Sequence, residues 1–222
     1  MAENSFKNVS AQPKVFFLLP VKTLFLLGGV FSAFFILIAG LVFFDYAHSM
    51  DNAIFNFVRS TPFNSSPILT LILQNTARLG SSQFVLPLSL LVGVFLSLYR
   101  RNLALGVWFV LSVVLFEALL ESLKHLLAYS IQWFSHSANF PNATALSLAL
   151  FYGLLILLIP HFITHQTLKN ILSYSLFGLI LLIGLALIVL GVSFSSILGG
   201  FCLGALGACF SIGIYLSVFQ KI

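Results

Sequence analysis

The feature of this chain that most restricts its fold is the length of its uncharged apolar stretches. Residues 23–44 contain no charged side chain, and none occurs between Asn170 and Gln220. A transmembrane helix needs about 20 mostly apolar residues to cross the hydrocarbon core of a bilayer. Only 7% of the 222 residues are charged, whereas soluble domains have about 25%. We therefore predict an integral, multi-pass membrane protein.

The apolar stretches divide into six predicted spans. The uncharged run that ends at Gln220 is too long for one helix, and GVSFSS at 191–196 is typical of a turn near the membrane interface. The predicted spans are 23–44, 82–99, 103–128, 144–163, 170–190 and 194–219. The fold class is therefore all-α, a six-span transmembrane helical bundle. We expect 1–22 to be a cytoplasmic N-terminal tail and 23–222 a single membrane domain.

The segment between the first two spans, 45–81, contains Pro62, Pro67 and many polar residues. Ser66 precedes Pro67, and a serine followed by proline is a typical start of a helix. The stretch that follows has one apolar and one polar face. We predict a short helix here that lies on the membrane surface and does not cross it.

The positions of lysine and arginine predict the orientation of the bundle, because cytoplasmic loops carry more of them. With six spans and a cytoplasmic N-terminus, seven lie on the cytoplasmic side and three outside: Lys7, Lys14, Lys22, Arg100, Arg101, Lys169 and Lys221 against Arg59, Arg78 and Lys124. We expect both termini in the cytoplasm of a bacterial cell, with the protein in its inner membrane. The 45–81 segment, the 129–143 loop and the 191–196 turn then share the outer face.

Four ionisable residues lie close together near the outer end of the third span: Glu117, Glu121, Lys124 and His125. Ionisable groups at membrane depth usually face the protein interior and have a partner. Lys124 and His125 are either interface residues, with Glu121 paired to Lys124, or functional groups. Glu117 lies one turn deeper with no cation nearby on its helix, so we expect a partner on another helix or a protonated carboxyl.

Two further stretches stand out near predicted span ends. NFPNATALSLAL, from Asn139, places a Phe-Pro pair and small residues at the start of the fourth span. LIVLGVSFSSILGGFCLGA leads into the sixth span, where Gly200 and Gly204 lie four residues apart. Small residues at that spacing allow close helix packing, which we expect to be internal.

The order of these features resembles the type-2 phosphatidic acid phosphatases, membrane enzymes that hydrolyse lipid and isoprenoid phosphates. LLESLKHLL resembles the start of the family's first motif, Lys-x6-Arg-Pro. NFPNATAL resembles its second, Phe-Pro-Ser-Gly-His-Ala, and the last stretch resembles its third, Ser-Arg-x5-His-x3-Asp. The resemblance implies six spans and an outer active site. In that family, one histidine attacks phosphorus, and an aspartate positions this histidine. A second histidine protonates the leaving oxygen, and a lysine and two arginines bind the phosphate.

Few of these motif residues occur here. Lys124 matches the lysine, but Ile131 and Gln132 stand where Arg-Pro is expected. Pro141 matches, but Ser-Gly-His is replaced by Asn142, Ala143 and Thr144. The third motif places Ala186 at the arginine, Val192 at the nucleophile and Ser196 at the aspartate.

Another alignment register does not restore the motif. The sequence has no histidine after His165, no arginine after Arg101 and no aspartate after Asp51. We therefore expect no catalytic residue of the family type. The expected vestigial or ligand-binding site comprises Lys124, Glu121, Glu117, Pro141, Asn142, Thr144 and Ser196. We expect no cofactor and no metal, because the histidines are split between the two faces and show no metal-ligand spacing.

The favoured function is a phosphatase-like membrane protein without hydrolysis, which binds a lipid or isoprenoid phosphate weakly or docks a membrane-protein partner. One alternative is an active lipid phosphatase with a rearranged site that uses His125 or His136, although His136 is better explained as a loop residue beside Trp133. Another is a small transporter or structural subunit. Nucleic acid is not an expected partner, because the cations are scattered.

Overall fold

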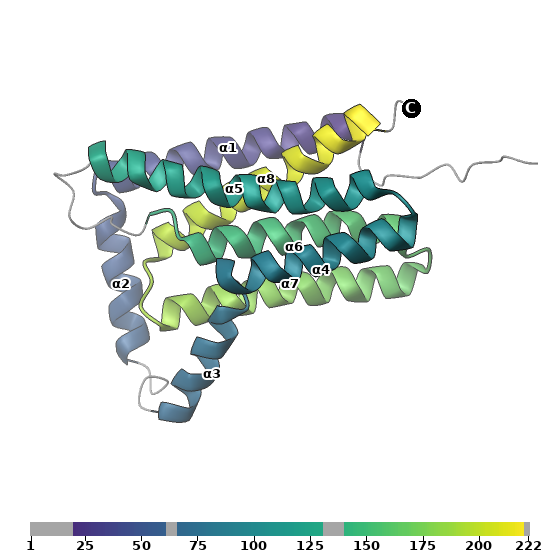
Figure 1. Ribbon diagram of the computed structural model, residues 1–222. Helices are drawn as coiled ribbons and strands as arrows, with labels where there is room; N and C mark the ends of the chain where they lie inside the picture. The colour runs from purple at the N-terminus through teal and green to yellow at the C-terminus, as the bar shows by residue number, and fades with distance from the viewer. Residues whose placement is uncertain (1–19, 61–65, 131–139, 220–222) are drawn as a thin grey trace, which may run out of the picture.

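The computed structural model describes residues 20–60, 66–130 and 140–219, with only the backbone of 126–130. Within these ranges the regular structure is helical (Figure 1). The helices are α1 (Val21–Phe43), α2 (Ala47–Ser60), α3 (Pro67–Arg78), α4 (Ser82–Arg100), α5 (Leu103–Ser130), α6 (Ala143–Phe162), α7 (Gln166–Val189) and α8 (Phe194–Phe219). The predicted all-α fold is confirmed.

Six helices of the described chain, α1 and α4 to α8, are long and apolar enough to cross a membrane. Their ends lie close to the predicted ones, except that α7 begins at Gln166 and not at 170. The first turn of α7 is helical but polar, so a prediction based on hydropathy does not include it in the span. The expected break before the last span is present, with Gly191 at φ 88°. The division into a tail and one domain stays a prediction, since most of 1–22 lies outside the described residues.

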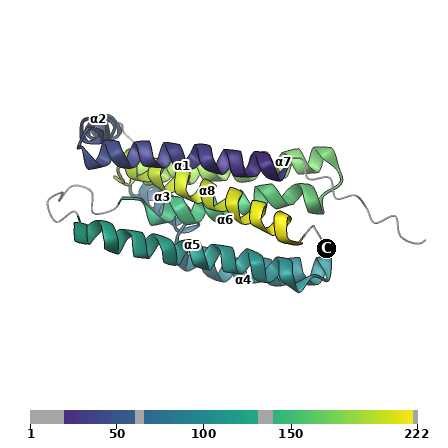
Figure 2. The same cartoon turned by 90° about the horizontal axis from the view of Figure 1, so that it is seen from above.

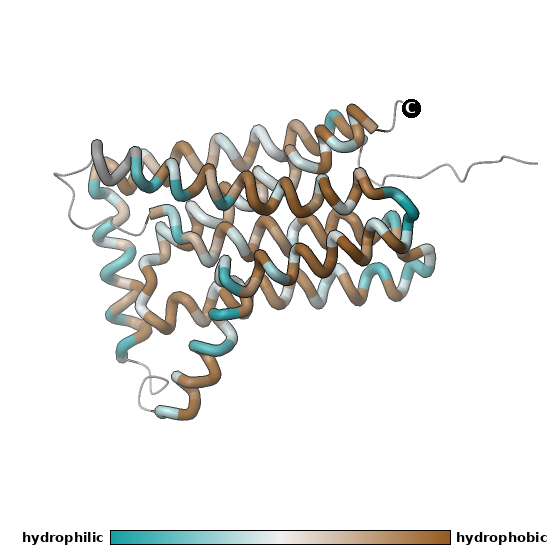
Figure 3. Tube along the Cα trace, viewed as in Figure 1, coloured by the Kyte–Doolittle hydropathy of each residue, from teal (hydrophilic) through white to brown (hydrophobic). Residues whose placement is uncertain are grey.

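Apolar side chains cover the outside of the long helices, as lipid contact requires. Figure 3 shows apolar colour along the bundle and polar colour at its ends and on α2. Leu26 and Ile36 of α1 and Leu185 of α7 are each more than three-fifths exposed. Water does not solvate such a surface favourably, whereas lipid does. The protein is therefore an integral, multi-pass membrane protein.

The centre of the bundle is the contact between α6 and α8. A Cβ atom added at Gly200 would lie 2.6 Å from the carbonyl oxygen of Asn142, and one at Gly204 would lie 2.5 Å from that of Leu146. The two helix backbones approach this closely only because these positions have no side chain. The expected internal packing of this small-residue stretch is confirmed.

The segment between α1 and α4 differs from the prediction, because it contains two helices and not one. The predicted helix is α3, and Ser66 caps it by accepting a hydrogen bond from Leu69 N at 3.4 Å. The unpredicted helix is α2, which lies across the end of the bundle in Figures 1 and 2. Local propensity did not indicate α2, since its sequence is rich in Asn, Ser and β-branched or aromatic residues.

Three segments that are distant in sequence meet at one end of the bundle. Figure 1 shows α2, the start of α6 and the turn before α8 together there, while the start of α1 and the end of α8 lie at the opposite end. The described parts of the predicted segments therefore lie at one end of the bundle, while most of the 129–143 loop lies outside the described residues. Which side of the membrane this face occupies stays a prediction.

Candidate functional site

The junction of α1 and α2 places three ionisable side chains three residues apart. Asp45 lies between the helices with φ 62°, a left-handed conformation that aspartate and asparagine adopt more readily than most residues. His48 and Asp51 follow in the first turns of α2. Asp51 is half-buried on the side of α2 that packs on the bundle, whereas His48 is exposed at the edge of that side.

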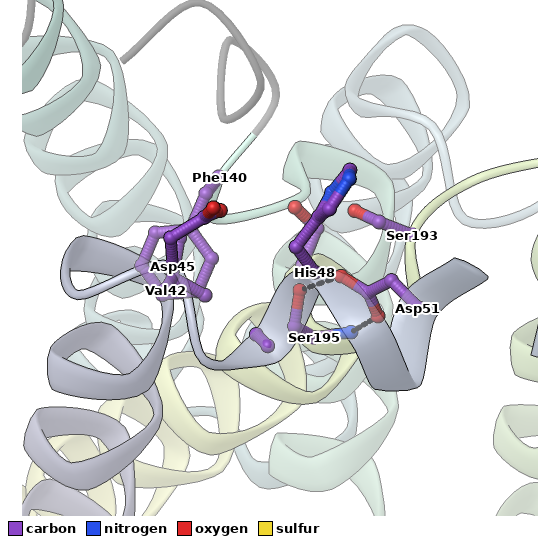
Figure 4. A pocket seen from close by; sticks show the side chains of 9 residues that line it. Val42, Asp45, His48, Asp51, Phe140, Ser193 and Ser195 are labelled. Atoms are coloured by element: carbon purple, nitrogen blue, oxygen red, sulfur yellow. Dashed lines mark hydrogen bonds between the residues drawn. The ribbon is translucent and has the colours of Figure 1, made fainter. Parts of the chain in front are cut away.

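Asp51 joins α2 to the beginning of α8. Its Oδ1 accepts a hydrogen bond from Ser195 N at 2.9 Å, and its Oδ2 accepts one from Ser195 Oγ at 2.5 Å (Figure 4). The first N–H groups of a helix have no partner within the helix and carry partial positive charge. The carboxylate therefore acts as a capping group for α8, supplied by a helix 144 residues away in sequence.

We expect Asp51→Ala to lower the melting temperature of the detergent-solubilised protein by about 2–4 °C, since losing a cap costs about 1 kcal/mol. Asp51→Asn keeps one acceptor oxygen and should lose about half as much. The melting temperature of both variants is measured from the fraction of protein that stays monodisperse in size-exclusion chromatography after heating. An Asp51→Ala protein as stable as wild type would show that this cap is not needed.

A small pocket opens between these elements, with a volume of about 40 Å³. That is room for roughly three water molecules. Its polar lining comes from the α1–α2 junction, from α2 and from the residues at and just before the start of α8: Asp45, His48, Asp51, Ser193, Ser195 and Ser196. The ring of Phe140, which stacks on Phe35 at 6.0 Å, forms part of its apolar wall (Figure 4). The pocket therefore combines two carboxylates, an imidazole and hydroxyl groups.

The Phe-Pro stretch that was predicted as part of the site holds α6 against α8. Pro141 is buried and follows a cis peptide bond. Asn142 N donates to Ser196 O at 3.0 Å, and Asn142 Oδ1 accepts from Ala145 N at 2.9 Å as the cap of α6. Thr144 packs against Gly80, where an added Cβ would lie 3.1 Å from its Cγ2. Of the predicted site residues Pro141, Asn142, Thr144 and Ser196, only Ser196 lines the pocket.

Glu117 is buried, with 8% of its surface exposed, and its partners lie on two other helices. Ser82 Oγ of α4 donates to Glu117 Oε2 at 2.8 Å, and Ser147 Oγ of α6 donates to Oε1. The expected partner on another helix is present, and it is a pair of hydroxyls, not a cation. Glu117 therefore links three spans and does not line the pocket.

Lys124 and Glu121 form an ion pair, with 3.5 Å between Nζ and Oε1. The expected pairing of Glu121 with Lys124 is confirmed, and the positive charge of Lys124 is partly compensated. His125 is exposed, and His136 lies outside the described residues. Neither Lys124 nor Glu121 lines the pocket, so the role of the predicted residues as one ligand site stays a prediction.

Apolar residues occupy the positions that the resemblance assigns to the arginine and the nucleophile. Ala186 is 1% exposed, and Val192 packs against the cluster of Ala145, Leu187 and Ile197. In the described ranges no group of three His, Cys, Asp or Glu side chains lies close enough to hold a metal ion.

Sequence reasoning missed the residues that contribute most polar groups to the pocket, namely Asp45, His48, Asp51, Ser193 and Ser195. The regular spacing of Asp45, His48 and Asp51 was the available signal. It was not recognised because the 45–81 segment was expected to contain only the helix from Ser66 onward.

Comparison with known proteins supports the fold. No family model matches the sequence, and a search of curated proteins found no match. Among solved structures, the chain is similar to the crystal structure of a transmembrane PAP2-type phosphatidylglycerolphosphate phosphatase from Bacillus subtilis, with 22% identity and a TM-score of 0.74. The match covers 88% of this chain and 98% of the other. The chain therefore has the fold of a PAP2-type, or type-2 phosphatidic acid, phosphatase, as the order of its motifs predicted.

Proposed function

We propose that this protein has the phosphatase fold without the hydrolytic reaction, and that the α2 end of its bundle binds the headgroup of a membrane lipid. In this proposal that end faces outward from a bacterial inner membrane, with both termini in the cytoplasm. The observation that carries the proposal is the apolar packing at the position expected for the nucleophile, Val192.

Chemical requirements support the absence of hydrolysis. Transfer of a phosphoryl group needs a nucleophile with a lone pair and cationic or N–H groups that stabilise the developing negative charge. Val192 and Ala186 supply neither, and no histidine, arginine or aspartate follows His165 in the sequence. The pocket beside them contains two carboxylates, which disfavour the approach of a phosphate.

Lipid binding is supported by the position of the pocket. Its lining includes Val42 in the last turn of the spanning helix α1 and Asp45, two residues after that helix ends at Phe43. The neighbouring side chains of Phe44 and Tyr46 are 67% and 72% exposed. Aromatic residues at the end of a spanning helix are typical of the membrane interface, where lipid headgroups lie. A lipid headgroup can therefore reach the pocket from the bilayer.

The alternative of an active phosphatase with a rearranged site is favoured by one observation, the similarity of the fold to a phosphatidylglycerolphosphate phosphatase. Besides His125 and His136, the structure adds His48 as an imidazole in a pocket. However, the outer-face arginines are not placed for phosphate: Arg59 lies over the ring of Phe55 at 4.5 Å, and Arg78 ends α3. Neither lines the pocket.

We expect the purified protein to release phosphate from phosphatidic acid, phosphatidylglycerolphosphate and undecaprenyl diphosphate no faster than the protein-free background. The Bacillus subtilis phosphatase in the same detergent is the positive control. Turnover that is abolished by His48→Ala, His125→Ala or His136→Ala would establish the active-enzyme alternative. Native mass spectrometry of the same preparation tests binding, and complete absence of retained lipid would favour partner docking or a structural role.

A further inference from the structure

The start of α8 offers little room for an anion, although a helix N-terminus normally favours one. The Asp51 carboxylate already accepts hydrogen bonds from both Ser195 N and Ser195 Oγ. A phosphate would have to displace this carboxylate and then lie beside two negative side chains, because Asp45 lines the same pocket. The pocket therefore suits a positively charged group.

Two acceptor groups of the pocket are free to receive a ligand. Ser196 is only 3% exposed and lines the pocket, yet in the described part of the chain its hydroxyl has no hydrogen-bond partner. The Asp45 carboxylate likewise has no partner among residues 20–60, 66–125 and 140–219. Ser196 is buried as a residue and lines the pocket, so its hydroxyl is available to a ligand there.

His48 lines the same pocket and contacts Asn52 one turn further along α2. The amide nitrogen of Asn52 lies 2.9 Å from Nε2 of His48. The pocket thus presents two carboxylates and one imidazole to a ligand.

The number and kind of acceptors point to the class of cation. A primary ammonium has three N–H donors and no acceptor, which matches the Asp45 carboxylate, the Ser196 hydroxyl and the remaining lone pairs of Asp51 or Ser193. A quaternary ammonium has no N–H donor and is normally held by several aromatic rings, whereas Phe140 is the aromatic residue in the described lining. A divalent metal is disfavoured because the described side chains form no three-ligand group.

We infer that this pocket binds the primary ammonium group of a membrane lipid, as found in an ethanolamine headgroup. The inference rests on the proposed lipid-binding function and adds the chemical class that the site recognises. The pocket lies at headgroup level, so the ammonium enters it while the lipid phosphate stays outside the pair of carboxylates.

The test compares lipids that share their acyl chains and differ in headgroup. Phosphatidylethanolamine, phosphatidylcholine and phosphatidylglycerol are titrated onto the full-length protein in detergent, and bound lipid is counted by native mass spectrometry. We expect ethanolamine lipid to bind about tenfold more tightly than the other two, the effect of one charge-assisted contact. In a separate experiment, soluble phosphoethanolamine is added together with phosphatidylethanolamine. If it displaces the lipid at equal concentration, the natural ligand is a soluble amine and not a membrane lipid.

Two variants remove the proposed contacts with little change of shape. Asp45→Asn keeps a side chain that tolerates the left-handed backbone, and Ser196→Ala removes only a hydroxyl. Both should reduce the preference for ethanolamine lipid to less than threefold. Ser217→Ala is the matched control on α8, since its exposed hydroxyl bonds to Ile214 O. It should keep the full preference.

The outcomes separate the two proposals. If lipid is retained but ethanolamine lipid has no advantage, or its advantage survives Asp45→Asn and Ser196→Ala, the ammonium site is wrong and lipid binding stands. If no lipid of any class is retained, both proposals fail. Melting temperatures of the variants, measured without lipid, show whether each one is folded.

Discussion

Replacing Gly204 with alanine is expected to lower the melting temperature of the detergent-solubilised protein by about 6–12 °C, the effect of about 3 kcal/mol. The new Cβ would lie 2.5 Å from the carbonyl oxygen of Leu146 and 2.8 Å from the Cβ of Ala149. A backbone oxygen cannot rotate away as a flexible side chain can. The central helices α6 and α8 would therefore have to separate, and they would lose contacts along their whole length.

Gly178→Ala on α7 is the matched control for Gly204→Ala. An added Cβ at Gly178 has no neighbour within 4 Å, and alanine favours the helix over glycine by up to about 1 kcal/mol. Its melting temperature should stay level or rise slightly. Thermal unfolding monitored by intrinsic fluorescence compares the two proteins. If both variants melt together with wild type, the close α6–α8 approach is not what holds the bundle.

The second large effect is expected for Glu117→Ala, with a loss of about 4–8 °C in melting temperature, or about 2 kcal/mol. The substitution removes the acceptor for hydroxyl groups on α4 and α6 and leaves an empty volume inside the bundle. Ser147 is fully buried and keeps only its bond to Ala143 O and a 3.3 Å contact with Ser82. The link between three spans is lost.

Glu117→Gln separates hydrogen bonding from charge. The amide has the same shape, accepts with its oxygen and donates with its nitrogen to a serine hydroxyl. We expect it to retain more than half of the stability that alanine loses. If glutamine is as damaging as alanine, the negative charge and not the hydrogen-bond network is what the fold requires. The same melting assay in one detergent compares both variants with wild type.

The transmembrane part of the fold could be predicted from sequence because each span is recognisable from its own residues. Hydropathy is a sum over neighbouring residues, and a bilayer requires the same apolar length from every helix that crosses it. The cap formed by Ser66 and Pro67 and the break at Gly191 are also local, so they too were predicted correctly. Helix α2 was missed, since its contact with α8 is not visible in its own residues.

The candidate site was predicted only in part. Ser196 was named because of its place in the family motif, and Glu117 because a carboxylate at membrane depth needs a partner. Asn142 and Thr144, named with them, serve helix capping and packing, and Lys124 is paired with Glu121. A motif position identifies where a residue falls in the chain, but it does not state which neighbour satisfies its polar groups.

By itself, the sequence determined that the described part of the chain contains six stretches long and apolar enough to span a membrane, and that no histidine, arginine or aspartate occurs beyond His165. Both properties follow from residue identity alone. Only the tertiary structure decided that Asp51 caps α8, that Asp45 and His48 line one pocket with Ser193, and that the Ser196 hydroxyl in this pocket has no hydrogen-bond partner among the described residues. The physical reason is that α2 packs across the end of the bundle, which brings together residues separated by 144 positions.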